Sequence, residues 1–311
     1  MSLSLEKLRQ LRAQAGQTLS AQPTVRTRAT DRAVPKQRDS SSPAGAAQRL
    51  QRLLARRTRG SQGAALLNPV SDASDRRLPG SEIAPGLWLI QSFLPQSIPS
   101  TALPLGFAKR PGQAIDPRQL LFFDTETTGL SGGTGTRAFM VGAADWWVDD
   151  DGHSGVRVRQ LLIANLAAEA SMLQTFASWL RPDTVLSSYN GRCYDAPLLK
   201  TRYRLARQPE PLSALDHLDL LFPSRRRWRG HFENCRLATI ERHVLGVVRE
   251  DDLPGSEAPA AWLGYLRGGS AVNLRRVVQH NHQDVVSLAQ LLLRLVDAEA
   301  ADQRLAGGLW A

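Results

Sequence analysis

Two carboxylates separated by one residue stand at the end of an apolar run. Asp124 and Glu126 follow Leu121-Phe122-Phe123. If this run is a β-strand, alternate side chains leave the same face, so the two carboxylates project side by side. Two anions that close repel each other unless a cation bridges them, and oxygen ligands suit a hard metal such as Mg²⁺ or Mn²⁺. A strand end with two solvated acids has the same pattern, so the interpretation depends on partners elsewhere in the chain.

Two later segments supply candidate partners for that pair. Asp195 comes soon after a predicted strand, where ligand sites of α/β sheets gather, although an acid is also a normal choice at the start of a helix. His280 and Asp284 are four residues apart in a predicted helix, so they are neighbours on one face, and that face also carries apolar residues. A carboxylate there is costly unless it is paired or binds a metal; a satisfied His–Asp pair is the alternative. His282 points elsewhere and is expected at the surface.

The elements that must position these residues alternate in type after residue 119. Strands are predicted at 119–124, 138–148, 156–163, 184–189 and 215–221, and helices at 173–180, 194–205, 237–245, 260–267 and 271–300. The first three strands suggest an antiparallel meander, and the later strands alternate with helices. This order predicts an α/β fold with a mixed central sheet flanked by helices. We expect one domain at 119–300, after a lead-in segment at 76–118 with a possible strand, and a short C-terminal tail at 301–311.

The N-terminal tail carries the whole net charge. Residues 1–60 hold 13 Lys or Arg and three acids, and the charges of the remaining residues cancel, so the net charge of +10 describes an appendage. Low apolar content without periodicity predicts that residues 1–75 are mostly disordered. A mobile basic arm attracts polyanions, so nucleic-acid contact is one interpretation. A solubilising extension and an organellar transit peptide are the alternatives.

The order of the acidic motifs resembles that of a known superfamily. Asp-x-Glu at 124–126, Asn-x₃-Tyr-Asp at 190–195 and a helical His-x₃-Asp at 280–284 are similar to the three motifs of the DEDD 3′→5′ exonucleases, which have a ribonuclease-H-like fold. The glycine-rich segment after the first motif and His-Leu-Asp-Leu-Leu at 217–221 are most similar to the bacterial YprB-like branch. The resemblance covers about residues 119–295.

This resemblance implies hydrolysis of nucleic-acid phosphodiester bonds from single-stranded 3′ ends by a two-metal mechanism. Two divalent metal ions, Mg²⁺ or Mn²⁺, would stabilise the attacking and leaving oxygens. The implied metal ligands are Asp124, Glu126, Asp195 and Asp284. The implied base for the attacking water is His280, since a histidine titrates near neutral pH. Its spacing to the aspartate is that of the tyrosine-type motif of the family, so its alternative role is to orient a ligand.

The implied substrate-binding residues gather around the first two motifs. They are Thr125, Thr127, Thr128, Gly129, Leu130, Asn190 and Arg137. The glycine-rich turn at 129–135 could bring backbone N–H groups near a phosphate, and a plain hairpin loop is the alternative. Four arginines and a tryptophan within 224–229 suit contact with a single strand, and a solvated surface is the alternative.

The composition of the chain limits the classes of protein and the cellular locations that fit it. No apolar run approaches the roughly 20 residues of a membrane helix, so no membrane partner is expected. Cys193 and Cys235 lie far apart, which argues against a disulfide framework or a structural zinc site and favours a reducing, cytoplasmic location. The leading hypothesis is a metal-dependent 3′→5′ exonuclease acting on DNA or RNA. The alternatives are a catalytically inactive nucleic-acid-binding or scaffolding protein with a basic tail, and an endonuclease on the same fold.

Overall fold

The computed structural model describes residues 75–129 and 134–308 of the chain. All but the last residue of the tail predicted at 1–75 lies outside the described residues, as does Leu130. Among the described residues, no helix is both long and apolar enough to cross a membrane.

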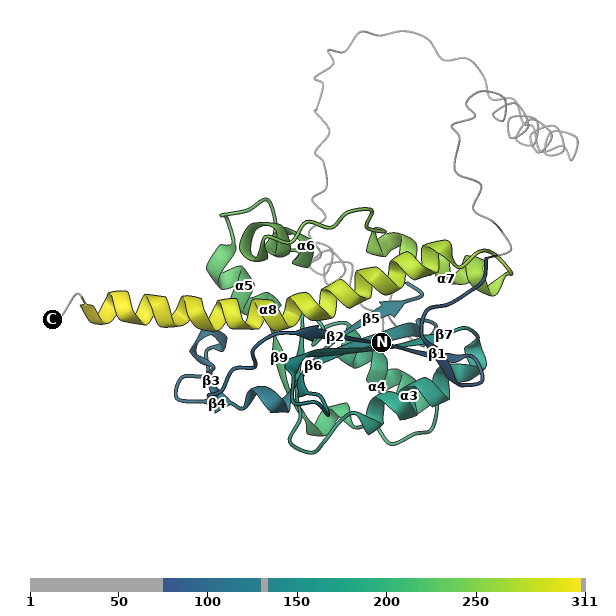
Figure 1. Cartoon of the computed structure of the whole chain (residues 1–311), viewed down its shortest axis with the longest axis horizontal. Coiled ribbons are helices and arrows are strands. Elements are labelled where there is room, and N and C mark those ends of the chain that lie inside the picture. The colour runs from purple at the N-terminus through teal and green to yellow at the C-terminus, as the bar shows by residue number, and fades with distance from the viewer. Residues whose placement is uncertain (1–74, 130–133, 309–311) are drawn as a thin grey trace, which may run out of the picture. The chain divides into compact units, whose positions relative to one another are not determined.

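A seven-stranded mixed sheet forms the centre of the described structure, with the strand order β1-β2-β7-β6-β5-β8-β9 (Figure 1). The strands are β1 (Ser81–Ala84), β2 (Leu87–Pro95), β5 (Leu120–Thr127), β6 (Ala138–Val148), β7 (Ser154–Ile163), β8 (Val185–Ser188) and β9 (Asp216–Asp219). The pairs from β1 to β5 are antiparallel, whereas β8 pairs parallel with both β5 and β9. The predicted combination of an antiparallel meander with parallel strands is confirmed. Two short strands, β3 (Leu103–Pro104) and β4 (Ala114–Ile115), form a separate ribbon.

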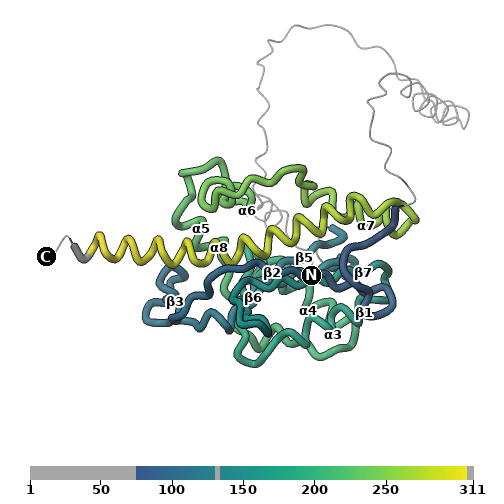
Figure 2. The backbone as a smooth tube through the Cα atoms, in the orientation of Figure 1, coloured from purple at the N-terminus to yellow at the C-terminus, as the bar shows by residue number. Residues whose placement is uncertain are grey.

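Helices cover both faces of this sheet. They are α3 (Glu169–Ser178), α4 (Asp195–Leu205), α5 (Leu221–Trp228), α6 (Leu237–Ile240), α7 (Ala258–Leu266) and α8 (Val272–Gly308). Figures 1 and 2 show α8 running across one face, while α3 and α4 lie on the other. Helix α8 continues beyond its predicted end near residue 300. A π-helical turn at Glu241–Leu245 follows α6, and Gly246 ends it with a φ of 69°, as expected for a glycine stop.

The central strand β5 divides the core by simple alternation. Leu120 and Phe122 pack in the cluster that contains the middle of α8, whereas Leu121 and Phe123 pack in the cluster that contains α3 and α4. Successive side chains of a strand point to opposite faces, so a continuous apolar run is what a strand covered on both faces requires. The next residue in the alternation, Asp124, therefore faces the side of α8.

The lead-in segment contributes to the same sheet. The possible strand expected near 86–90 is β2, and it pairs antiparallel with β7 along its whole length, from Leu87 opposite Ile163 to Pro95 opposite Gly155. Without β2, the mostly buried strand β7 would expose a row of unpaired backbone groups. The sheet therefore includes two strands that precede residue 119.

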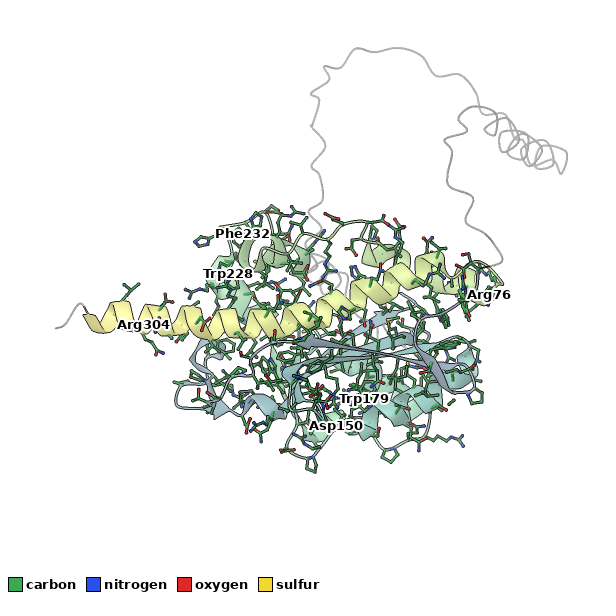
Figure 3. The ribbon with its side chains drawn as sticks, viewed as in Figure 1. Arg76, Asp150, Trp179, Trp228, Phe232 and Arg304 are labelled. Carbon is green, nitrogen blue, oxygen red and sulfur yellow. The ribbon has the colours of Figure 1, made fainter. Side chains whose placement is uncertain are left out.

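The C-terminal half of α8 anchors a small helical layer. Trp228 and Phe232 pack against the apolar cluster that contains this part of the helix, and Figure 3 shows them on the α5–α6 side of α8. Arg304 lies near the far end of the same helix (Figure 3). Because α8 spans from α7 to this layer, it is the element that fixes residues 280–284 over the sheet.

Candidate metal centre

Strand β5 directs its two carboxylates toward α8. The strand extends to Thr127, three residues beyond its predicted end at 124, so Glu126 belongs to it together with Asp124. Asp124 lies opposite Gly142 of β6, and Glu126 lies opposite Met140. Pairing with β6 at both positions limits their motion, which gives the two acids a rigid floor.

The amide of Asn281 fits over this floor because Gly142 has no side chain. Asn281 is fully buried, and its Nδ2 donates to Oδ2 of Asp124 at 3.0 Å. A Cβ on Gly142 would lie 2.0 Å from Asn281 Oδ1, so only glycine permits this approach. Gln160 of β7 completes the arrangement, since its Nε2 donates to Asn281 Oδ1 at 2.9 Å and to the carbonyl of Val278 at 2.8 Å. The amide orientation of Asn281 is thereby fixed as a donor to Asp124.

Asp195 reaches the centre from the other side of β5. It is the first residue of α4, and its Oδ1 accepts a hydrogen bond from the hydroxyl of Thr125. Thr125 points to the opposite face from Asp124 and Glu126, so β5 contributes to the centre through both faces. The structure thus gives Thr125, predicted as a substrate contact, a role in holding a carboxylate.

Asp284 and His280 complete the cluster from one face of α8, as predicted. Single ligand atoms of Glu126, His280 and Asp284 lie within 4.8 Å of one another. His280 Nε2 lies 3.5 Å from Asp284 Oδ2, and His280 Nδ1 lies 2.7 Å from Asp252 Oδ1. Both ring nitrogens therefore face carboxylates. The surface placement expected for His282 is wrong: it is partly buried, and its Nε2 lies 2.8 Å from the hydroxyl of Ser92 on β2.

A buried arginine already contacts the helix side of the centre. The guanidinium of Arg249 donates to both carboxylate oxygens of Glu241, at 2.8 and 2.5 Å, and also to Asp284. The side chain of Arg249 is 11% exposed and that of Glu241 only 1%. Its NH1 lies 3.1 Å from His280 Nδ1. The π-helical turn that contains Glu241 is an uncommon element that is frequent at functional sites.

Burial raises the pKa values of all four acids, and repulsion from the other acids of the centre adds to this at Asp124 and Glu126. Burial, and then the charges of the other acids, raises the pKa of Asp124 well above 3.8. Burial raises the pKa of Glu126 from 4.5 to about 8, against the attraction of His280, and that of Asp195 to about 6, against its hydrogen bond from the hydroxyl. The pKa of Asp284 is also raised by burial, although the neighbouring arginine and histidine oppose the shift.

This donor set fits a divalent cation. Four carboxylates on three elements share a site where protonation or a metal must relieve their repulsion, and carboxylate oxygens are the ligands that Mg²⁺ and Mn²⁺ prefer. A second acidic group, Asp149, Asp151 and His153, lies in the β6–β7 turn. There Asp149 Oδ1 accepts the backbone N–H groups of Asp151 and His153, which is ordinary turn chemistry.

The other residues expected to bind substrate fall into two groups. Thr127 and Thr128 bond locally, the first to the carbonyl of Gly129 at 3.1 Å and the second to the backbone N–H of Arg137 at 3.0 Å. The side chain of Arg137 is bound to the carboxylate of Glu169. These contacts place the three residues beside the end of β5.

Asn190 adopts a left-handed conformation, with a φ of 68°. Its backbone N–H donates to Asp219 Oδ1 at 2.8 Å, which ties the second motif to the end of β9. The arginines at 224–229 do not form one uniform patch: Arg227 is paired with Asp302 at 2.7 Å, and Arg226 donates to the carbonyl of Phe107.

Sequence reasoning missed four residues that shape the centre, namely Gln160, Glu241, Arg249 and Asn281. Gln160, which directly precedes the apolar run Leu161-Leu162-Ile163, was a usable signal, since a buried amide needs partners. Arg249 lies in an irregular segment between helices, where no periodicity marks it. Its contacts depend on how the chain folds back after Gly246.

A mixed sheet of this strand order, with an acidic centre between its middle strand and a helix that crosses it, defines a ribonuclease-H-like domain. The chain belongs to the RNase_H superfamily, whose family profile matches residues 121–296. It is 37% identical over 184 residues to the uncharacterized protein YprB of Bacillus subtilis (strain 168), a match that covers 59% of this chain and 43% of that relative. The chain therefore spans less than half the length of this relative.

Solved structures of exonuclease I also resemble the chain. Its apo form matches with a TM-score of 0.36 and 15% identity, over 58% of this chain and 43% of that one. The E. coli exonuclease I complex with a dT13 oligonucleotide matches with a TM-score of 0.34 and 14% identity, over 52% and 42%. At TM-scores this low, these likenesses carry no argument about function.

Proposed function

We propose that this protein is a metal-dependent 3′→5′ exonuclease that hydrolyses phosphodiester bonds of DNA or RNA. The observation that carries the proposal is the convergence of Asp124, Glu126, Asp195 and Asp284 in one partly buried cluster whose pKa values are raised. Burying four acids together is costly, and binding of divalent cations is the function that offsets this cost. The polarity and the need for a free end come from the resemblance of the motifs to the DEDD exonucleases.

In this reaction, water attacks the terminal phosphorus and the bond to the 3′ oxygen of the preceding nucleotide breaks, which releases a nucleoside 5′-monophosphate. Two divalent cations, when bound, would stabilise the attacking and leaving oxygens. Asp124 and Glu126 would hold them from β5, Asp195 from α4 and Asp284 from α8.

His280 has two candidate roles in this scheme. As a base it would take the proton of the attacking water; as a positioning residue it would orient Asp284. Its ring nitrogens face Asp252 and Asp284. Burial lowers the pKa of His280, but the charge of Asp284 and the hydrogen bond with Asp252 outweigh this effect, so the pKa is raised from its ordinary value of 6.5. Because both ring nitrogens are held between Asp252 and Asp284, this geometry favours the positioning role.

One observation favours the alternative of an inactive nucleic-acid-binding protein. Arg249 donates to Asp284, so one of the four acids is compensated without a metal. This alternative predicts binding that weakens with salt and no turnover in any metal.

Labelled oligonucleotides distinguish these functions. The purified full chain should shorten 5′-labelled single-stranded DNA or RNA in Mn²⁺ or Mg²⁺ and not in EDTA. Asp124→Asn should reduce the rate by about a thousandfold or more, in line with the several kcal/mol that metal ions supply to such reactions. Asp183→Asn, which changes an exposed acid paired with Arg181, is the matched control and should keep the wild-type rate. Equal shortening by wild type and Asp124→Asn would refute the proposal, and cleavage of closed circular DNA would favour the endonuclease.

A further inference from the structure

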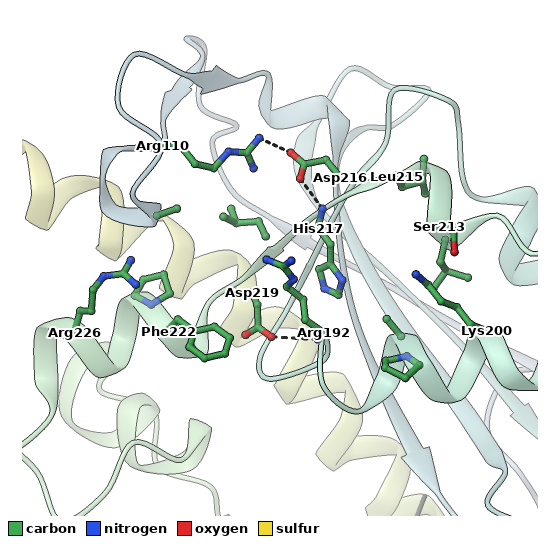
Figure 4. Close-up of a pocket in the computed structure, with 16 residues that line it drawn as sticks. Arg110, Arg192, Lys200, Ser213, Leu215, Asp216, His217, Asp219, Phe222 and Arg226 are labelled. Atoms are coloured by element: carbon green, nitrogen blue, oxygen red, sulfur yellow. Dashed lines mark hydrogen bonds and ion pairs between the residues drawn. The ribbon is translucent and has the colours of Figure 1, made fainter. Parts of the chain in front are cut away.

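A basic pocket lies next to the metal centre, on the far side of α4's first turn. Its volume is about 570 Å³, which is within the range of small-ligand sites. We define the basic pocket by Arg110, Arg192, Lys200, His217, Phe222 and Arg226, which all line it. Figure 4 shows Phe222 and Arg226 from α5 on one side and Lys200 from α4 on the other, with His217 between them.

The basic pocket is lined by more cationic side chains than carboxylates. Arg110 is paired with Asp216 at 2.6 Å, which removes one pair of opposite charges. Arg192, Lys200 and Arg226 remain against a single carboxylate, that of Asp219. Asp219 itself is occupied, because it accepts the backbone N–H groups of Asn190, Arg192 and Leu221 at 2.8, 3.1 and 3.0 Å.

Among the described residues, Lys200 and Arg226 have no acidic partner, whereas Arg192 is attracted to Asp219 without forming an ion pair with it. Within residues 75–129 and 134–308, no carboxylate forms an ion pair with Arg192, Lys200 or Arg226. Arg226 donates only to a neutral carbonyl, that of Phe107, at 2.6 Å. Burial, and then the charges of Arg192 and Lys200, lowers the pKa of His217 to about 4, so the histidine adds no charge near neutral pH. The pocket thus presents a net positive charge suited to a phosphate.

An exposed aromatic ring stands at this positive site. The side chain of Phe222 is 43% exposed although it follows the buried Leu221 at the start of α5. Aromatic rings beside a positively charged groove are the elements with which proteins bind single-stranded nucleic acids, since bases stack on the ring while cations contact the backbone. A small anion such as free phosphate would not need the ring.

The pocket and the metal centre both include residues from the start of α4. Asp195 begins α4 and faces Thr125, while Ala196, Pro197 and Lys200 of the same helix line the pocket. The two sites therefore share one helical turn. A strand with its end at the centre passes the pocket if it leaves along this end of α4.

We propose that the basic pocket binds an internal nucleotide of the nucleic-acid strand whose end lies at the metal centre, with its phosphates on Lys200, Arg192 and Arg226 and a base stacked on Phe222. The identity of the ligand rests on the proposed function, because hydrolysis of a strand is what makes nucleic acid the expected occupant. The pocket itself is defined without reference to catalysis.

Equilibrium binding tests this proposal independently of turnover. The full-length Asp124→Asn protein in Mg²⁺ is titrated against fluorescein-labelled dT12 and U12, and the intact length of each probe is checked afterwards. Adding Lys200→Gln and Arg226→Gln should weaken binding about tenfold at 0.1 M salt and lower the slope of log Kd against log salt by about 1.4, the value for two lost phosphate contacts on a single strand. Thermal unfolding of each protein shows whether it is folded.

A matched pair of changes controls for net charge. Arg267→Gln with Arg304→Gln removes two exposed charges outside the pocket and should leave both the affinity and the slope unchanged. Equal weakening by the two double variants would overturn the proposal. Competition by thymidine monophosphate or inorganic phosphate as strong as that by unlabelled dT12 would also overturn it, since the site would then bind a free phosphate compound.

The two proposals fail separately. If the wild type hydrolyses no substrate but dT12 binding depends on Lys200 and Arg226, the exonuclease proposal fails and the pocket proposal stands. If hydrolysis depends on Asp124 but binding does not depend on the pocket, only the pocket proposal fails.

Discussion

The strand side of the metal centre and its helix side hold their acids by different chemistry. On β5, Asp124 accepts a hydrogen bond from the neutral amide of Asn281. On α8, Asp284 is bound to the guanidinium of Arg249, which is in turn fixed by the buried Glu241. A neutral donor orients a carboxylate without cancelling its charge, whereas a guanidinium does both.

The two sides therefore differ in whether they require an added cation. The strand side has no basic side chain bonded to Asp124 among the described residues, so a metal ion is the cation that would complete it. The helix side carries its own cation and can form before a metal arrives. The centre thus has a preformed wall on α8 and a floor on β5 that depends on an added charge. Three changes test this difference between the strand side and the helix side.

The largest effect on stability is expected from Arg249→Met, which leaves Glu241 buried without a cation and Asp284 with His280 alone. Breaking a buried pair from one side costs about 3–5 kcal/mol of unfolding free energy. Urea denaturation in EDTA measures this loss, and Mn²⁺ should stabilise the variant more than the wild type because it supplies the missing charge. Arg227→Met, which removes the exposed pair with Asp302, is the control and should change little. If Arg249→Met were as stable as this control, the helix side would not depend on its own cation.

An intermediate effect is expected from pH on the strand side. The pKa of Glu126 is about 8 in the folded protein against 4.5 ordinarily, so between these values the folded chain retains a proton that the unfolded chain has lost. The unfolding free energy of the metal-free protein therefore falls as pH rises from about 4.5 to 8. The raised pKa values of Asp195 and His280 act in the same direction.

We expect a fall on the order of 2 kcal/mol, since one pKa unit corresponds to about 1.4 kcal/mol and neighbouring acids share their protons. Denaturation at a series of pH values in EDTA measures it. Glu126→Gln should flatten the profile, and saturating Mn²⁺ should stabilise the wild type most at the alkaline end, where the ligands are deprotonated. If the unfolding free energy of the wild type in EDTA rose toward pH 8, the raised pKa of Glu126 would be contradicted.

The acids of the strand side were far easier to predict from the sequence than Arg249, the cation that compensates the helix side. The apolar run of β5 and the spacing of His280 and Asp284 are local patterns, and the structure contains the strand and the helix face that they predict. The cation of the helix side is not local: Arg249 reaches Asp284 only because a π-helical turn and the stop at Gly246 return the chain to α8. Likewise, the pairing of β2 with β7 joins residues far apart in sequence, which no short-range pattern encodes.

The smallest effect is expected from Gly142→Ala, which tests the neutral support of Asp124. The added Cβ would lie 2.0 Å from Asn281 Oδ1, so the buried amide must move and its hydrogen bond to Asp124 must lengthen. Overpacking of this kind costs about 1–3 kcal/mol. Gly264→Ala is the control, because its Cβ meets nothing within 4 Å and alanine favours the helix α7. Denaturation should show Gly142→Ala destabilised and Gly264→Ala equal to or above the wild type. If Gly142→Ala left the stability and the Mn²⁺ affinity unchanged, Asn281 would not fix Asp124. Arg249 on the helix side would then be the one support of the centre that these changes had tested and not refuted.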